Sequence, residues 1–416
     1  MSARRFAIIS LSVTGACLPL FVVRWHYGPI PTTLLELLIW ITAAAYLLTL
    51  WTEKRLPRAR TPLDIPIVVL LIAGAISVAD APNHTSALGI YRAYFVEAIA
   101  MFYIAYDLLR DRKDVMFFVT VMAAGAAVFA VGQIVVFLHA VATHHLNLSA
   151  APSFLNTSPN ADAFYLEPPL AFALAFTLHG TSRRERLIAT GLLALFFVAM
   201  VVAFSRGSYA AMAVLAVVIA LSFQNHRFRV RAIAVIAVLA LISVEIPYVN
   251  RRFLTLADSV TNREGLYTMA LKMLSHMPIT GAGIGGYPIR VAPYRPRGYI
   301  IQIYPHDIWL TTWSELGLLG VLAFAFIFFS VLVRAARALP AATDISVPLL
   351  WGSIGTLVLI LVHGLVDSPY WKNDLSVQFW LVVALQFVAI RFALPARAAT
   401  ERAGPPSPAP APQKQT

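Results

Sequence analysis

Charge and cysteine are what this chain has least of. Of its 416 residues only 12% are charged, whereas 59% are hydrophobic. Soluble domains carry about 25% charged residues. The single cysteine, Cys17, excludes an intrachain disulfide and a cysteine-based metal cluster. Apolar runs of about 18 residues or more recur along the chain, which predicts an all-α polytopic membrane protein.

The apolar runs predict twelve transmembrane helices. We expect them at residues 6–23, 33–50, 65–78, 90–109, 115–139, 161–178, 187–204, 207–223, 232–247, 308–332, 347–365 and 375–390. Basic residues gather in the short loops of one side, and this explains the net charge of +12 without nucleic-acid binding. Since positive loops stay inside, both termini are expected in the cytoplasm. The tail, residues 399–416, is rich in Pro and Ala and is expected to be disordered.

The long loop at residues 248–306 breaks this charge rule. It is expected outside the cytoplasm, because long loops translocate despite their charge. Its cations are Arg251, Arg252, Arg263, Lys272, Arg290, Arg295 and Arg297. An anionic ligand would explain cations on the outer side, and anionic lipid headgroups are the competing explanation.

The same loop contains a pattern of helical spacing and a run of glycines. Residues 263–277 place apolar side chains at helical intervals, which predicts a helix lying on the membrane surface. The run from Gly281 to Gly286 resembles a nucleotide-binding fingerprint only superficially, because no strand precedes it and no helix follows. We expect flexible backbone that lines a substrate path.

His306 stands where this loop enters the next expected helix, and it is the first candidate catalytic residue. At 100° per residue it shares one helical face with Leu310, Trp313, Gly317 and Gly320. The glycines would let another helix or a lipid chain approach closely, so we expect His306 to point into the crevice that they open. A histidine beside cations at the membrane boundary is a candidate general base. Alternatively, it only caps or packs.

Three arginines are candidate ligands for an anion. Arg206 lies in a tight outer turn between two apolar runs, Arg263 begins the predicted loop helix, and Arg290 follows the glycine run. The planar guanidinium suits bidentate phosphate binding. Each arginine could instead be a solvated or snorkelling charge, so the prediction of a site depends on their converging near His306.

Three further residues are weaker candidates. Asp307 suits the first turn of the helix after His306. Arg92 faces either an outer cavity or lipid headgroups, and its i to i+5 spacing from Glu97 argues against an ion pair within one helix. Asp367 would orient a base or an arginine, or would simply end a helix before Pro369.

These motifs together resemble the O-antigen ligase / O-antigen polymerase superfamily, bacterial membrane enzymes that use polyprenyl-linked sugars. The ligase signature is His, then Asn, Ser or Gln, nine residues, Gly, two residues and a small or aromatic residue. Here His306-Asp307 is followed by nine residues, Gly317, two residues and Gly320, so Asp307 departs from the pattern. The turn at 205–207, the segments at 262–263 and 278–283, and the layout with one large loop also match. The resemblance is strongest over residues 190–380.

The resemblance implies a GT-C-like fold and a periplasmic active site in the bacterial inner membrane. Residues 1–398 would form the transmembrane glycosyltransferase domain, with 248–306 as its large periplasmic loop containing short helices. The donor would be a glycan on undecaprenyl pyrophosphate, whose pyrophosphate Arg206, Arg263 and Arg290 would hold. His306 would deprotonate the acceptor hydroxyl, which attacks with inversion, and neither a metal nor another cofactor would be needed.

Several functions stay open at this point. An O-antigen ligase would use lipid A-core as the acceptor, and an O-antigen or exopolysaccharide polymerase would use a second lipid-linked repeat unit. A protein O-glycosylating relative is a further option. A polysaccharide or lipid transporter is the alternative of another class, but the chain has no internal repeat, and its outer cations gather on one side rather than at the midplane.

Overall fold

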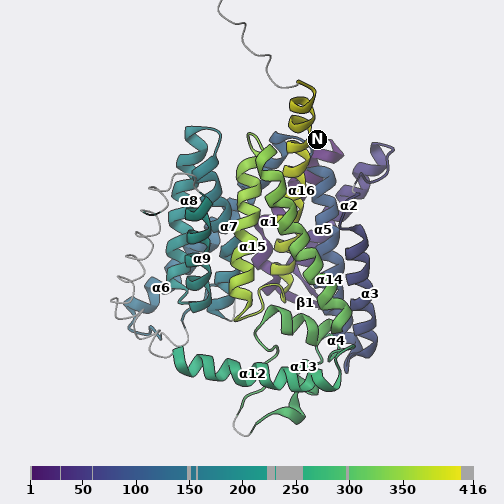
Figure 1. Ribbon diagram of the computed structural model, residues 1–416, viewed down its shortest axis with the longest axis vertical. Helices are drawn as coiled ribbons and strands as arrows, with labels where there is room; N and C mark the ends of the chain where they lie inside the picture. The colour runs from purple at the N-terminus through teal and green to yellow at the C-terminus, as the bar shows by residue number, and fades with distance from the viewer. Residues whose placement is uncertain are drawn as a thin grey trace, which may run out of the picture.

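The computed structural model is a bundle of long helices with one helix lying across its end (Figure 1). It describes residues 2–28, 30–58, 60–147, 151–155, 158–222, 230, 256–296 and 299–403. The helix expected at 232–247 therefore lies outside the described residues, as do Arg251, Arg252 and Arg297.

The bundle is built from helical segments that run between two ends. In chain order they are α1 (Ala3–Ala16), α2 (Leu34–Thr52), α3 (Asp64–Asp80), α4 (His84–Tyr91) continuing through a π-helical turn (Arg92–Val96) into α5 (Glu97–Leu108), α6 (Arg112–Ala142), α7 (Pro159–His179), α8 (Arg183–Val202), α9 (Arg206–Ser222), α14 (Ile308–Ala338), α15 (Ser346–Gly364) and α16 (Asn373–Ala403). Helix α16 continues past residue 399, where we expected the tail to begin, and residues 404–416 lie outside the described part.

Seven described segments are long and apolar enough to cross a membrane. They are Leu34–Thr52, His84–Leu108, Arg112–Ala142, Arg183–Val202, Ile308–Ala341, Ser346–Gly364 and Asn373–Ala393. The prediction of a mostly helical, multi-pass membrane protein is confirmed. Helices α1, α3 and α9 are shorter, with 14, 17 and 17 residues, and α7 carries Asp162, Glu167 and two internal prolines.

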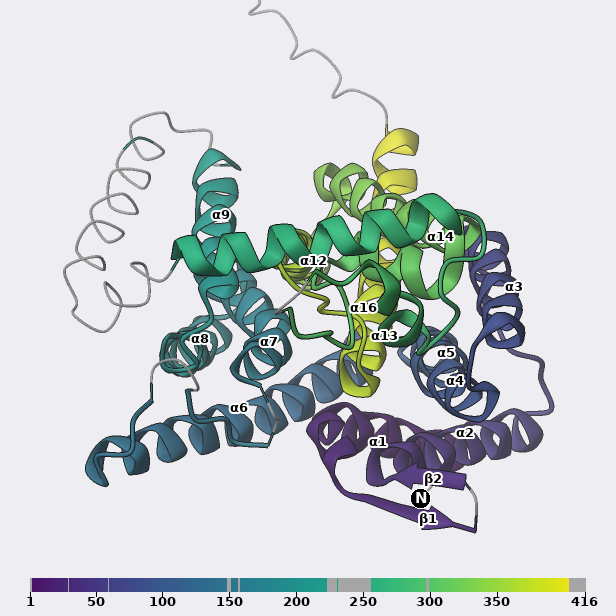
Figure 2. The same ribbon diagram turned by 90° about the horizontal axis from the view of Figure 1, so that it is seen from below.

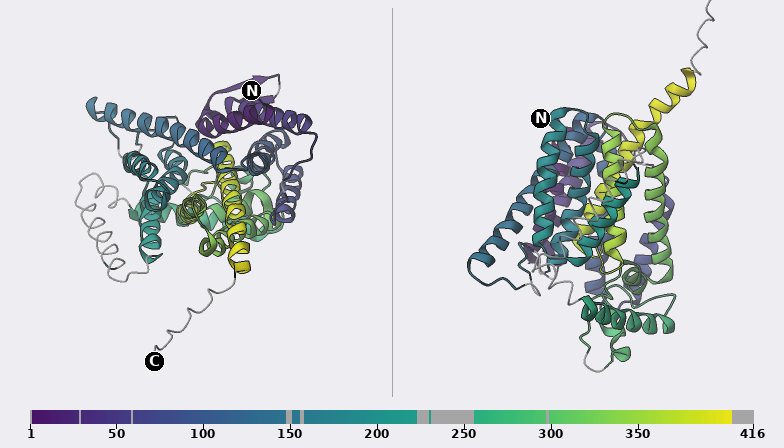
Figure 3. Two further views of the ribbon diagram at one scale, coloured as in Figure 1. Left: turned by 90° about the horizontal axis from the view of Figure 1, so that it is seen from above. Right: turned by 60° about the vertical axis from the view of Figure 1, so that its left-hand side comes forward.

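The two ends of the bundle differ. Both ends of the described chain lie at one end, and the helix α12 (Leu256–His276) lies across the other, which we call the α12 end (Figures 1 and 3). Figure 2 shows α12 crossing this end from the side of α9 to the side of α14. The short helix α13 (Tyr287–Arg290) and a 3-10 turn (Ala292–Tyr294) follow it in the same loop.

Helix α12 confirms the predicted loop helix, although it begins earlier than residue 263. Its apolar residues Leu266, Ala270 and Met273 are buried against Tyr287 and Val291 of the same loop. The protein itself therefore covers much of the apolar face that we expected to rest on the membrane.

The glycine run is a docked loop rather than a flexible path, so that expectation is wrong. The amide of Ala282 donates to the carbonyl of Ser314 (2.5 Å), and that of Leu318 donates to the carbonyl of Ile279 (3.0 Å). Helix α14 opens at Gly317, whose φ is 68°, to receive this loop. A Cβ at Gly317 would lie 2.1 Å from the Ile279 carbonyl oxygen, so only glycine fits there.

A small β-hairpin departs from the all-α expectation. Strands β1 (Arg24–Tyr27) and β2 (Ile30–Thr33) pair antiparallel between α1 and α2, with Arg24 opposite Thr33. Gly28 in the turn has a φ of 57°, which favours glycine in a tight hairpin. The first helix, which we expected to continue to residue 23, ends at Ala16, and a 3-10 helix (Leu18–Val22) leads from it to the hairpin.

Candidate functional site

The candidate site lies at the α12 end, where His306 precedes the first turn of α14. His306 has a φ of 58°, a left-handed conformation that is uncommon outside glycine. The next residue, Asp307, is the N-cap of α14, and its Oδ1 accepts hydrogen bonds from the amides of Trp309 (2.9 Å) and Leu310 (2.8 Å). The expectation that His306 shares a helical face with Gly317 and Gly320 is therefore wrong, because His306 stands before the helix and the helix opens at Gly317.

The imidazole of His306 is paired with a carboxylate from the other side of the site. Its Nδ1 lies 2.8 Å from Oδ1 of Asp367, just beyond α15, and the His306 side chain is 31% exposed. We call these two residues the exposed pair. A carboxylate can only accept, so Nδ1 carries the proton and Nε2 is the nitrogen that can take up another.

Asp367 is held from several directions. Asn160 of α7 donates to its Oδ2 (2.7 Å), and the amide of Ser368 donates to its Oδ1 (2.9 Å). Burial alone would raise the pKa of Asp367, but the hydrogen bond and charge of His306, the charge of His363 and the Asn160 hydrogen bond lower it to about 2. The carboxylate is thus ionised at neutral pH and fixed in orientation before any substrate binds.

Helix α12 carries Arg263 and Tyr267, and Tyr267 contacts the backbone next to the exposed pair. The Tyr267 hydroxyl lies 2.8 Å from the carbonyl oxygen of Leu365 and 3.2 Å from that of His306. Burial raises the pKa of Tyr267, and the Arg263 guanidinium one turn away opposes that rise. Within the described residues, the buried Nη1 of Arg263 has no hydrogen-bond partner. An unpaired buried guanidinium nitrogen, on the helix whose Tyr267 contacts the His306 carbonyl, is suited to an anionic ligand.

Arg206 begins α9 next to a second histidine–carboxylate pair. His363 Nδ1 lies 2.5 Å from Glu167 Oε1, and the two side chains are 1% and 0% exposed. We call these two residues the buried pair. The hydroxyl of Ser205 lies 3.3 Å from His363 Nε2, and a Cβ at Gly207 would lie 2.3 Å from the His363 ring. The turn that carries Arg206 therefore packs closely against the His363 ring.

Helix α7 and the chain around the end of α15 contribute to both pairs. Asn160, which donates to Asp367, and Glu167 lie two turns apart on α7, and Asp367 follows His363 by four residues, just beyond α15. The sequence analysis missed the buried pair. Ionisable residues within membrane-spanning segments are rare and usually functional, so Glu167 and His363 could have been found by that signal alone.

Arg290 is engaged elsewhere. Its guanidinium donates to Asp80 Oδ2 (2.7 Å) and to the Asp80 carbonyl (2.6 Å), and it approaches the Gly281 carbonyl (3.4 Å). The described contacts of Arg290 thus fasten the glycine loop to the end of α3 and do not include the exposed pair.

The argument that spacing excludes an ion pair between Arg92 and Glu97 is wrong. It forms ion pairs with Glu36 (2.6 Å) and with Glu97 (3.4 Å). The π-helical turn Arg92–Val96 explains the second pair, because an i to i+5 turn brings residues five apart onto one face. Arg92 also lies over the Trp40 ring, at 5.5 Å. It links α2 to α5 inside the bundle.

Comparison with known proteins finds one family model that covers part of the site. A family model described as O-antigen ligase matches residues 191–326, about a third of the chain. The matched stretch includes Arg206, Arg263, Arg290 and His306. It ends before His363 and Asp367. No curated protein matches the chain. Among the described residues, no group of three His, Cys, Asp or Glu side chains could hold a metal ion. Residues 191–326 thus confirm the predicted resemblance of this chain to the O-antigen ligase / O-antigen polymerase superfamily.

Proposed function

We propose that this chain transfers a glycan from undecaprenyl pyrophosphate to lipid A-core at the periplasmic face of the inner membrane, as an O-antigen ligase does. The main observation behind this proposal is the exposed pair. Its histidine is oriented by an ionised carboxylate and is accessible at the α12 end. The family match supports an O-antigen ligase or polymerase in general. The donor, the acceptor and the residue roles below are our proposal.

In this proposal His306 is the general base. Its Nε2 takes the proton of the acceptor hydroxyl while the hydroxyl oxygen forms a bond to the anomeric carbon of the donor. The bond from that carbon to the pyrophosphate oxygen breaks, and the pyrophosphate leaves with the electron pair. Attack opposite to the leaving group inverts the anomeric centre. Asp367 stabilises the imidazolium that forms and holds it in the correct tautomer.

The arginines stabilise the leaving group. Arg263 is the first candidate, because its buried Nη1 lacks a partner in the described part of the chain and charge-assisted contacts to phosphate are strong. Arg206, from the other side, is held by the turn on the buried pair. Arg290 would have to give up Asp80 to reach a ligand, so we now assign it the role of anchoring the loop. Asp307 and Arg92 act through packing.

Orientation follows from the distribution of charge. The loops between α2 and α3, α5 and α6, and α7 and α8, at the end opposite to α12, are rich in arginine, which supports a cytoplasmic location for that end under the positive-inside rule. The exposed pair and α12 then face the periplasm, where a flipped lipid-linked donor would present its pyrophosphate at the membrane surface.

Deleting the gene and separating the lipopolysaccharide on a gel tests this function. Loss of all long glycan, with polymer accumulating on the lipid carrier, is expected for the ligase. Lipopolysaccharide that carries a single repeat unit would overturn the ligase and support the polymerase. Unchanged lipopolysaccharide would contradict both and leave another glycan acceptor or transport. Complementation with the intact gene should restore the long glycan.

A further inference from the structure

Residues of α14 and α16 line a wide groove. Its arginines lie toward the ends of these helices that are opposite to α12 (Figure 1). Its volume is about 860 Å³. The aromatic rings of Phe326, Phe329 and Phe387 form its walls together with Ile390. Phe326 and Phe329 are 59% and 45% exposed, so the groove opens outward with an apolar lining. In a membrane protein such a lining is covered by lipid chains.

The charged side chains that line this groove are all arginines, namely Arg334, Arg337 and Arg391. Arg391 donates to the carbonyl of Tyr106 (3.1 Å) and to that of Leu109, which fixes it at the rim. Arg334 and Arg337 are exposed, and neither forms an ion pair or hydrogen bond with any described residue. They lie three residues apart in the last turns of α14, so they project from one face.

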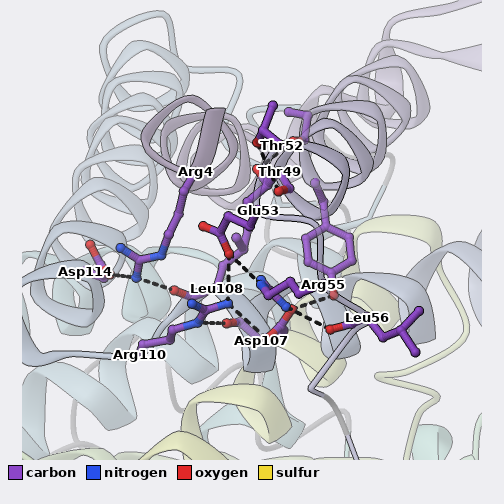
Figure 4. Close-up of polar contacts among 12 residues, drawn as sticks. Arg4, Thr49, Thr52, Glu53, Arg55, Leu56, Asp107, Leu108, Arg110 and Asp114 are labelled. Atoms are coloured by element: carbon purple, nitrogen blue, oxygen red, sulfur yellow. Dashed lines mark hydrogen bonds and ion pairs between the residues drawn. The ribbon is translucent and has the colours of Figure 1, made fainter. Parts of the chain in front are cut away.

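Several other arginines at the same end of the molecule are compensated. Figure 4 shows Arg4 paired with Asp114, and Arg55 and Arg110 gathered around Asp107 and Glu53. In that cluster the cations neutralise the buried carboxylates of Asp107 and Asp114. No carboxylate lines the groove. The positive charge of Arg334 and Arg337 is therefore not explained by an internal partner in the described part of the chain.

We propose that the groove binds an anionic phospholipid. The phosphate of the headgroup lies between Arg334 and Arg337, and the acyl chains lie along Phe326 and Phe329. Basic pockets between transmembrane helices commonly recognise anionic headgroups, and arginine suits phosphate geometrically. A free phosphate ion would use the same arginines but would leave the aromatic walls uncovered, so the apolar lining favours a lipid.

The bound lipid would act on stability rather than on chemistry. It would bridge α14 and α16 at the end away from His306, since His306 and Asp307 directly precede the other end of α14. A ligand that binds only the folded state stabilises that state by a free energy that grows with the logarithm of its concentration over its dissociation constant. An anionic lipid should thus raise the thermal stability of the purified protein more than a zwitterionic one.

The test uses the full chain purified in a neutral detergent. Mixed micelles with phosphatidylglycerol, phosphatidylcholine or added inorganic phosphate are compared by thermal unfolding and by native mass spectrometry of retained lipid. We expect a higher Tm and a retained lipid only with phosphatidylglycerol. The double variant Arg334→Ala/Arg337→Ala should bind it about 30-fold more weakly, since each surface arginine contributes roughly a factor of five.

The matched control is Arg183→Ala/Arg184→Ala, which removes two exposed arginines at the start of α8, outside the groove. This variant should keep the affinity of the unchanged chain. An equal loss in both double variants would mean general charge attraction and would overturn the site. Equal stabilisation by inorganic phosphate would show a free-anion site, and no preference for phosphatidylglycerol would show that no anionic lipid site exists. Because all four arginines are exposed, the variants should fold.

Discussion

Two histidine–carboxylate pairs in this molecule have similar nitrogen–oxygen distances but different surroundings. The exposed pair joins His306 to Asp367 at 2.8 Å, and the buried pair joins His363 to Glu167 at 2.5 Å. The imidazole of His306 is 31% exposed, whereas that of His363 is 1% exposed. The buried pair joins α15 to α7, whereas the exposed pair joins the segment after α15 to the residue just before the N-cap of α14.

The difference in exposure separates two kinds of work. A base must reach the proton that it takes, and only the exposed histidine is open to a substrate. The buried histidine contacts Ser205 and leaves no room for a side chain at Gly207, so it shapes the turn that carries Arg206. In our proposal the exposed pair transfers a proton and the buried pair positions a cation.

The sharpest test of this comparison is His306→Ala. We expect a loss of transfer of about 10²–10⁴-fold, the usual contribution of a positioned general base. Transfer is measured with purified enzyme, lipid-linked donor and acceptor. The control His84→Ala removes an exposed histidine elsewhere at the α12 end and should retain full activity. Normal transfer by the His306→Ala variant would remove the base from the proposal.

Asp367→Asn should have the next largest effect. The amide keeps the shape of the side chain but loses the charge that stabilises the imidazolium and selects its tautomer, so we expect a loss of about 10²-fold or more in kcat. Asp367→Glu keeps the charge and should recover part of the activity. Folding is followed by thermal unfolding of each variant. If Asp367→Asn lowered the Tm but left kcat intact, Asp367 would be only a structural partner of His306.

The sequence located the exposed pair better than it described its geometry. Boundary position and nearby cations pointed to His306, but its left-handed backbone is set by the cap at Asp307 and by contacts with α12. Asp307 departs from the ligase pattern, yet it caps the helix as Asn or Ser in that pattern also can. The departure at Asp307 therefore keeps the N-cap hydrogen bonds of the helix.

The missed features depend on contacts between distant parts of the chain. Arg290 meets Asp80 across 210 residues, and His363 meets Glu167 across 196 residues. Helical periodicity predicts which residues share a face of one helix, but not which helices meet. The prediction about Arg92 and Glu97 failed for a local reason. A spacing argument at 3.6 residues per turn does not foresee the extra residue of a π-helical turn.

The smallest catalytic effect is expected at the buried pair, and it sharpens the comparison by its form. Glu167→Gln keeps a hydrogen-bond acceptor for His363 but removes the charge. If the pair only positions Arg206, KM for the lipid-linked donor should rise about threefold to tenfold while kcat changes little, because ground-state and transition-state binding weaken together. The Tm should fall as well, since one partner of a buried pair is altered.

The matched variant His363→Gln tests the same turn from the other side. It should raise the donor KM as Glu167→Gln does, and the double variant should add little, since the two residues act as one unit. A large fall in kcat without a change in KM would instead put the buried pair in the proton-transfer chemistry. In that case the division of roles between the exposed and buried histidines would fail, because burial alone would no longer separate the base from its support.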